Sequence, residues 1–210
     1  DSYNRKIRLI KNDKFKNNLI ISISREHGTN GKEIGRLVAN KLNISFFDKE
    51  EIKEFAIKNN MIDNNYSNEE IYDNFLSLDV SKEAIINQAN VIKKIANDSD
   101  AVIIGRCADY ILRENKNLIK LFIYAPMNYK IKNLLKNYGD NEKQARNHIL
   151  ASDKSRSNYY SAIANSTWGD KNNYDLCIDA KIGNENVVKI ICDYVKNRYL
   201  WIMSYNLFTS

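Results

Sequence analysis

The sequence predicts an α/β fold built around a parallel sheet. Five short apolar runs, rich in β-branched residues, alternate with segments in which apolar residues recur at helical spacing. The chain has 210 residues, enough for one compact domain, and no internal repeat or low-complexity linker divides it. Strands that alternate with helices pair in parallel through right-handed crossovers, which gives this fold class.

The first predicted strand, Leu19 to Ser24, is a continuous apolar run that we expect to be buried on both faces. It leads into a glycine-containing loop, residues 25–32, and then into a helix that extends through Leu42. The same reasoning predicts four more strands, at 44–47, 101–104, 119–125 and 174–178. The first predicted unit of the fold is therefore a strand, followed by a glycine loop and a helix.

The remaining helices follow from apolar spacing and from residues that begin or end elements. Pro126 ends the fourth strand and precedes a helix, Ser81 is the expected N-cap of a long amphipathic helix, and Asn184 is expected to cap the last one. Helices are also predicted at 49–58, at 106–113 and across 140–164.

Composition excludes several classes of protein. A hydrophobic fraction of 43% with 28% charged residues is ordinary for a globular domain and unlike a disordered, collagen-like or disulfide-stabilised chain. The longest uncharged run, Tyr199 to Ser210, has twelve residues where a spanning helix needs about 20, and residues 1–17 lack the apolar core of an export signal. We therefore expect a cytoplasmic protein without a membrane partner. We expect its cysteines to be reduced packing thiols, namely Cys107, Cys177 and Cys192.

The net charge of +6 is concentrated at the start of the chain. Residues 1–17 contain six Lys or Arg and two Asp, a charge of +4, so the rest of the chain supplies only +2. We interpret residues 1–17 as a basic, flexible tail and residues 18–210 as a single domain, and we expect no nucleic-acid partner. The alternative, nucleic-acid binding through the tail, predicts affinity that is lost on deletion of the tail and falls steeply with salt.

The loop after the first strand has the features of a phosphate-binding site. Glycines let backbone N–H groups turn inward, and the following helix adds the positive end of its dipole. Gly31 and Lys32 match the second glycine and the lysine of the pattern G-x-x-x-x-G-K-[ST]. Glu26 and Glu33 depart from the pattern, at the first glycine and at the metal-binding hydroxyl. A strand-to-helix turn whose glycines only relieve strain is the alternative.

The residues from Ile21 to Gly35, including Ser24-Arg25-Glu26-His27, resemble the opening of the bacterial cytidylate kinase-like family, a branch of the P-loop nucleoside monophosphate kinases. Later blocks are similar to that family in the same order: 46–50, 105–110, 153–160 and 168–176. The resemblance covers about residues 19 to 195. It implies a three-layer P-loop kinase fold with a five-stranded parallel sheet, the first strand central, a helical acceptor-binding region at about 48–98 and a lid at about 139–173.

The resemblance also implies a reaction. ATP, with Mg²⁺, would donate its γ-phosphate to a nucleoside monophosphate, CMP or dCMP, so the expected partners are small-molecule nucleotides. The ATP phosphates would be bound by the loop residues Arg25, His27, Gly28, Thr29, Asn30, Gly31 and Lys32. The acceptor would be bound by Asp48, Arg106 and Asp109, and the catalytic cations would be Lys32 with Arg156 and Lys154 of the lid. No residue is assigned to the metal, because Glu33 stands where the metal-binding hydroxyl belongs.

Each of these roles has an alternative. Asp48 is equally suited to cap the helix that starts at Lys49, Arg106 to form an ion pair, and Arg156 with Lys154 to lie on a solvated helix face. The function has alternatives as well: a kinase for another small phosphate acceptor, or a catalytically weak nucleotide sensor, which Glu33 favours. The apolar end, residues 199–208, packs either on its own domain or on a second copy, so the sequence leaves the oligomeric state open.

Overall fold

The protein is described by a computed structural model, which covers residues 18–61, 82–138 and 141–208. Its centre is a five-stranded sheet in which every neighbouring pair is parallel. In spatial order the strands are β2 (Ser45–Phe47), β3 (Ala101–Ile104), β1 (Ile20–Arg25), β4 (Leu118–Tyr124) and β5 (Leu176–Asp179). The first strand is central, as predicted, and Ile21 lies opposite Val102 on one side and Ile119 on the other.

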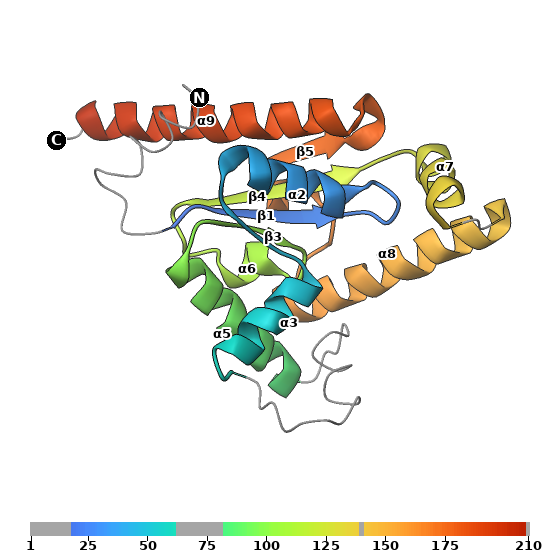
Figure 1. Cartoon of the computed structure of the whole chain (residues 1–210), viewed down its shortest axis with the longest axis horizontal. Coiled ribbons are helices and arrows are strands. Elements are labelled where there is room, and N and C mark those ends of the chain that lie inside the picture. Colours follow the sequence, from blue (N-terminus) through green and yellow to red (C-terminus); the bar gives the residue numbers. More distant parts are fainter. Residues whose placement is uncertain (1–17, 62–81, 139–140, 209–210) are drawn as a thin grey trace.

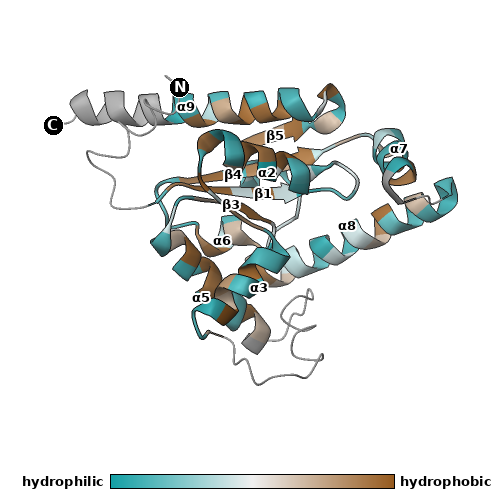
Figure 2. Ribbon diagram, in the orientation of Figure 1, coloured by the Kyte–Doolittle hydropathy of each residue, from teal (hydrophilic) through white to brown (hydrophobic). Residues whose placement is uncertain are grey.

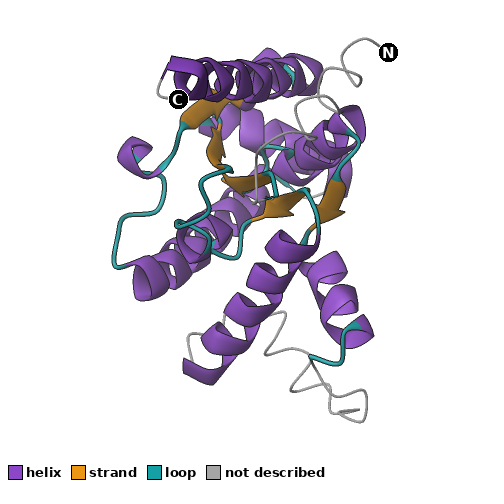
Figure 3. Ribbon diagram, turned by 90° about the vertical axis from the view of Figure 1, so that its left-hand side faces the viewer, coloured by secondary structure: helices purple, strands orange, loops and turns teal. Residues whose placement is uncertain are grey.

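Helices cover both faces of this sheet and its carboxyl end (Figure 1). One face carries α2 (Gly31–Leu42) and α9 (Asn184–Phe208), and the other carries α3 (Lys49–Lys58), α5 (Lys82–Asp98) and α6 (Ala108–Ile111). At the carboxyl end of the strands lie α7 (Met127–Tyr138) and α8 (Glu142–Ala164). Two short 3₁₀ turns, η1 (Lys171–Asn173) and η2 (Ala180–Ile182), flank β5. Figure 3 shows the strands between the two helical layers.

Two hydrophobic cores, one on each face, hold the three layers together. Alternate residues of a strand point to opposite faces, so Ile21 and Ile23 pack under α2 and α9 while Ile20 packs against α5. All three side chains are fully buried. In Figure 2, β3 and β5 are accordingly brown, whereas β1 is paler because serines alternate with its isoleucines, and α8 is mostly teal and white.

The predicted elements are confirmed within one or two residues, with one exception described below. The predicted N-cap Ser81, the tail at 1–17 and parts of the predicted acceptor region and lid, 62–81 and 139–140, lie outside the described residues. The cysteines are free thiols, as expected, and two of them, Cys107 and Cys192, are buried. Among the described residues, no helix combines the length and the apolar character that crossing a membrane requires.

Candidate active site

A cavity of about 280 Å³ opens at the carboxyl ends of β1 and β3, the edge at which parallel α/β sheets bind their ligands. Its walls come from the ends of these strands, from the starts of α2 and α3, and from α8. The lining residues are Ser24, Arg25, Lys32, Asp48, Lys49, Glu50, Ile104, Gly105, Arg106, Cys107, Arg156, Tyr159, Tyr160 and Trp168. The cavity thus brings together five of the predicted site residues.

Arg25, the last residue of β1, passes between two glycines. A Cβ atom at Gly31 would lie 2.6 Å from Cγ of Arg25, and a Cβ atom at Gly105 would lie 2.5 Å from its Nη1. Glycine at these two positions therefore leaves room for the arginine side chain, and this role is separate from the formation of the turns. The guanidinium is directed across the cavity toward the loop that follows β3.

Three guanidinium groups face this cavity: Arg25, Arg106 and Arg156. Burial lowers the pKa of Arg25 to about 9, and the neighbouring charges of Arg156 and Arg106 contribute to this shift. Burial also lowers the pKa of Arg106 and of Arg156. All three remain protonated at pH 7, so the cavity concentrates positive charge and favours an anionic ligand.

The segment after β3 differs from the prediction, which placed a helix over 106–113. Gly105, Arg106 and Cys107 all have a left-handed backbone, with φ of 69°, 58° and 53°, and α6 begins only at Ala108. Left-handed geometry costs a non-glycine residue about 1 kcal/mol, so this turn is strained at two positions. The turn directs Arg106 toward the cavity, where its Nη1 donates to Oε1 of Gln88 at 3.2 Å.

Lys32, the lysine of the glycine loop, is bound to carboxylates of α3. Its ammonium forms an ion pair with Asp48 and lies 3.6 Å from Oε2 of Glu50, while its side chain is 55% exposed. The hydrogen bond with Asp48 raises the pKa of Lys32. Burial raises the pKa of Asp48, but its bonds with Glu51, Lys32 and Glu50 outweigh burial and hold that pKa well below its usual range.

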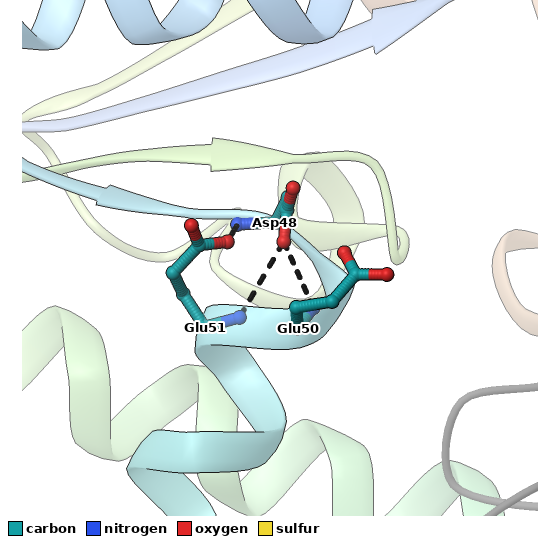
Figure 4. A group of neighbouring side chains, drawn as sticks. All are labelled: Asp48, Glu50 and Glu51. Atoms are coloured by element: carbon teal, nitrogen blue, oxygen red, sulfur yellow. Dashed lines mark hydrogen bonds between the residues drawn. The ribbon is translucent and has the colours of Figure 1, made fainter.

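Asp48 is also the N-cap of α3, which was the alternative reading of its sequence position. Its Oδ1 accepts from the N–H groups of Glu50 and Glu51, and Glu51 accepts from the N–H of Asp48 in return (Figure 4). The three carboxylates offer oxygens within 4.8 Å of one another, and oxygen ligands suit Mg²⁺. However, Lys32 binds Asp48 and Glu50, Lys49 binds Glu50 at 3.2 Å, and Arg36 binds Glu51 at 3.0 Å. The group is therefore already neutralised and does not fit a metal ion as it stands.

The glutamate in place of the first loop glycine, Glu26, fastens the loop to the sheet. Its carboxylate accepts from the N–H of Ala125 at 3.1 Å and from Nζ of Lys130 at 2.9 Å. Lys130 is 5% exposed, and a Cβ atom at Gly28 would lie 2.9 Å from its carbonyl oxygen, so the loop packs directly on α7. Asn133, one turn along α7, donates to the carbonyl of Gly28.

Asp153 of α8 joins the loop to the predicted lid. Its Oδ1 accepts from the backbone N–H of His27 at 2.7 Å and from Nη1 of Arg156 at 3.1 Å, and its Oδ2 lies 3.4 Å from Nζ of Lys130. Burial lowers the pKa of His27, and the charge of Arg156 lowers it further, so the imidazole is neutral at pH 7. One carboxylate therefore connects the glycine loop, α7 and α8.

Not every predicted residue reaches the cavity. Lys154 is exposed and does not line it, because two residues along a helix turn a side chain by about 200° from Arg156. Lys154 therefore lies outside the cavity in this structure, and its predicted role over the phosphates stays a prediction. His27, Gly28, Thr29 and Asn30 form the loop beside the cavity without lining it.

A helix over 106–113 would place Asp109 on one face with Arg106, but the left-handed turn places the start of α6 between them. The side chain of Asp109 is directed into the interior, is 3% exposed, and its Oδ2 accepts from the hydroxyl of Tyr160 at 2.9 Å. Tyr160 itself lines the cavity. Asp109 therefore lies behind the cavity wall and supports Tyr160, and its predicted role in binding the acceptor stays a prediction.

Stability should depend on pH through Asp109. Burial raises the pKa of Asp109, although the hydrogen bond from Tyr160 opposes the shift. Above about pH 4 the unfolded chain has released the proton of Asp109, whereas the folded chain still holds it. The free energy of unfolding should therefore decrease as pH rises from about 4 to the pKa of Asp109 in the folded chain. Urea denaturation between pH 4 and pH 7 measures this slope. Asp109→Asn should flatten it, whereas the exposed Asp193→Asn should leave it unchanged; equal slopes for all three proteins would contradict the assignment.

Sequence reasoning gave no role to three residues that organise the site. Gln88 had a detectable signal, because it is a single polar residue on the otherwise apolar face of α5. Asp153 begins the block 153–160 that resembles the family, but nothing there indicates its partner, and Lys130 carries no signal. Their partners in the glycine loop are 126 and 104 residues away from them. Only the folded chain shows that the loop depends on them.

Comparison with solved structures shows which fold this is. The chain is similar to an uncharacterized protein from Eubacterium ventriosum ATCC 27560, with 34% identity, a TM-score of 0.71 and coverage of 85% of this chain and 98% of that one. It is also similar to shikimate kinase from Bacteroides thetaiotaomicron, at 13% identity, a TM-score of 0.53 and coverage of 85% and 98%. A gluconokinase from Sinorhizobium meliloti 1021 matches at 10% identity and a TM-score of 0.51, over 91% and 96%. The fold is that of the P-loop kinases.

The sequence itself identifies the family. No curated protein matches the chain. The family model described as the cytidylate kinase-like family matches residues 20–182, which include all five strands, the glycine loop and every cavity-lining residue. The chain therefore belongs to the cytidylate kinase-like family.

Proposed function

We propose that this protein is a phosphotransferase that moves the γ-phosphate of ATP to a small acceptor that itself carries a phosphate. The observation that carries this proposal is the set of three arginines, Arg25, Arg106 and Arg156, that line one cavity beside a glycine loop. Phosphoryl transfer needs little covalent chemistry from the protein and depends on positive charge placed around the moving group. The cavity supplies that charge.

The donor would lie on the glycine loop at the start of α2. The first N–H groups of a helix have no partner within the helix, and they and the helix dipole bind phosphate oxygens. Lys32 would leave Asp48 and Glu50 for the phosphates of ATP, which the exposure of its side chain permits. Arg156, on the α8 side of the cavity, would contact the transferred group, and Arg106 would bind the acceptor phosphate with its planar fork.

We propose CMP or dCMP as the acceptor, with ATP supplied as its magnesium complex. Membership of the cytidylate kinase-like family supports a nucleoside monophosphate. The cavity adds Tyr159, Tyr160 and Trp168, which offer aromatic surface in reach of a base. A kinase for a different phosphorylated acceptor would use the same arginines, so only the identity of the base distinguishes CMP or dCMP from such an acceptor.

A second function, nucleotide sensing without turnover, is favoured by the state of Lys32. Its ion pair with Asp48 must break before it can reach a phosphate, and Glu33 adds an exposed carboxylate to the first turn of α2. Both features act against the placement of a cation on the transferred phosphate, which turnover requires. Calorimetry distinguishes the two functions, because a sensor binds ATP and produces no ADP when acceptors are added.

The decisive experiment is a phosphotransfer assay with ATP and Mg²⁺ across the common nucleoside monophosphates. We expect the diphosphate product with CMP or dCMP, and we expect Lys32→Ala to lower turnover at least tenfold, because the cation on the donor phosphates is lost. Lys41→Ala, at the exposed far end of α2, is the matched control. ATP binding without product from any acceptor would favour the sensor, and turnover indifferent to Lys32→Ala would place the reaction elsewhere.

A further inference from the structure

Gln88 is a buried amide with two partners from different parts of the fold. It lies on α5 with 4% exposure, on a face shared with Val91, Ile92 and Ile95. Its Oε1 accepts from Nη1 of Arg106 at 3.2 Å, and its Nε2 donates to the hydroxyl of Tyr159. A buried amide needs such partners, and here both of them line the cavity.

Arg106 is a side chain that needs to be held in place. It follows a glycine in a left-handed turn, and its guanidinium stands near the like charge of Arg25, which repels it. A long arginine side chain also loses rotamer entropy when it is fixed. The hydrogen bond to Gln88 opposes both the repulsion and the entropy loss.

The chemistry of the Gln88 side chain is suited to this task. A glutamate at the same position would also accept the hydrogen bond, but it would add a negative charge beside the guanidinium and weaken its attraction for an anion. An amide orients the guanidinium without adding charge. We propose that Gln88 is a positioning residue that directs Arg106 toward the acceptor phosphate; this inference rests on the proposed function.

Gln88 also connects the two arginines that come from outside β1. Tyr159 lies three residues after Arg156, so both occupy one side of α8 and both line the cavity. Because Gln88 binds Tyr159 and Arg106 together, it holds α8 and the loop after β3 in one relative position. Loss of the amide should therefore disturb the acceptor side of the cavity and spare the glycine loop.

The test compares Gln88→Met and Gln88→Glu with the wild-type chain in the phosphotransfer assay. Removing a hydrogen bond to a charged group should raise the KM for the acceptor at least tenfold in Gln88→Met, and Gln88→Glu should raise it as much or more through its charge. The KM for ATP should stay within twofold in both. Asn90→Asp, an exposed amide-to-acid change two residues along α5, is the control and should alter neither value.

Equal effects on both KM values, or none on the acceptor KM, would overturn the role of Gln88. Gln88→Glu keeps the size of the side chain, so it tests the proposal even where Gln88→Met fails to fold. The proposed function fails separately, when the wild-type chain gives no product with any acceptor. In that case calorimetry with inorganic phosphate tests Gln88 alone: the proposal expects tenfold weaker binding by Gln88→Glu than by the wild type, and unchanged binding would refute it.

Discussion

Replacing Arg106 by alanine should lower kcat/KM for the acceptor about a hundredfold while the affinity for ATP stays within twofold. The guanidinium lines the cavity from the loop after β3, whereas the donor binds the glycine loop after β1 in the proposed function. Loss of Arg106 removes one of the three arginines that line the cavity and leaves Gln88 without that partner. Coupled-assay kinetics give the acceptor constant, and calorimetry gives the ATP affinity.

Arg113→Ala is the matched control for Arg106→Ala, because Arg113 is an exposed arginine beyond α6 that packs on Tyr110 and does not line the cavity. We expect no change in either constant from this control. The double variant with Gln88→Met should be little worse than Arg106→Ala alone, since the amide acts through the guanidinium. A fall in ATP affinity equal to the fall in acceptor efficiency would contradict the assignment of Arg106 to the acceptor.

The sheet was predictable because its strands obey local rules. β1 is a run of apolar residues that is too short for a helix and is followed by a loop with glycines. The alternation of such strands with amphipathic helices favours a parallel sheet, which the structure has. The central position of β1 came from the family resemblance, and the strand order confirms it. Only the helix over 106–113 failed, because helical spacing does not reveal that Arg106 and Cys107 adopt left-handed geometry.

Apart from Lys32, which the glycine-loop pattern indicated, and Arg156, which the family resemblance indicated, the site was predictable only where a residue is adjacent in sequence to a strand end. Arg25, Asp48 and Arg106 each lie at or just after the carboxyl end of a strand, so one rule about parallel sheets brings them to one edge. The supporting residues obey no such rule. Glu26 departs from the phosphate-binding pattern, and only the structure shows that it binds Lys130, which is 104 residues away. Partners of this kind are fixed by the packing of α7 and α8 on the loop, which no local pattern encodes.

The largest effect on stability should come from Lys130→Met, which removes the cation that two carboxylates share. Lys130 is 5% exposed, and its Nζ lies 2.9 Å from Glu26 and 3.4 Å from Asp153. Without it, these carboxylates stay partly buried and repel each other, although Asp153 keeps Arg156. Breaking a buried ion pair on one side costs about 3 kcal/mol, so the free energy of unfolding in urea at pH 7 should fall by about that amount.

The control is Lys132→Met, an exposed lysine two residues along the same helix, which should change the free energy of unfolding by less than about 0.5 kcal/mol. The cause can be separated from a packing defect by adding Glu26→Gln to Lys130→Met. If uncompensated charge is responsible, neutralising Glu26 should recover part of the lost stability, because the repulsion with Asp153 disappears. A loss that is as small as the control, or that the second substitution only deepens, would mean that the ionic contacts of Glu26 do not hold the glycine loop to α7.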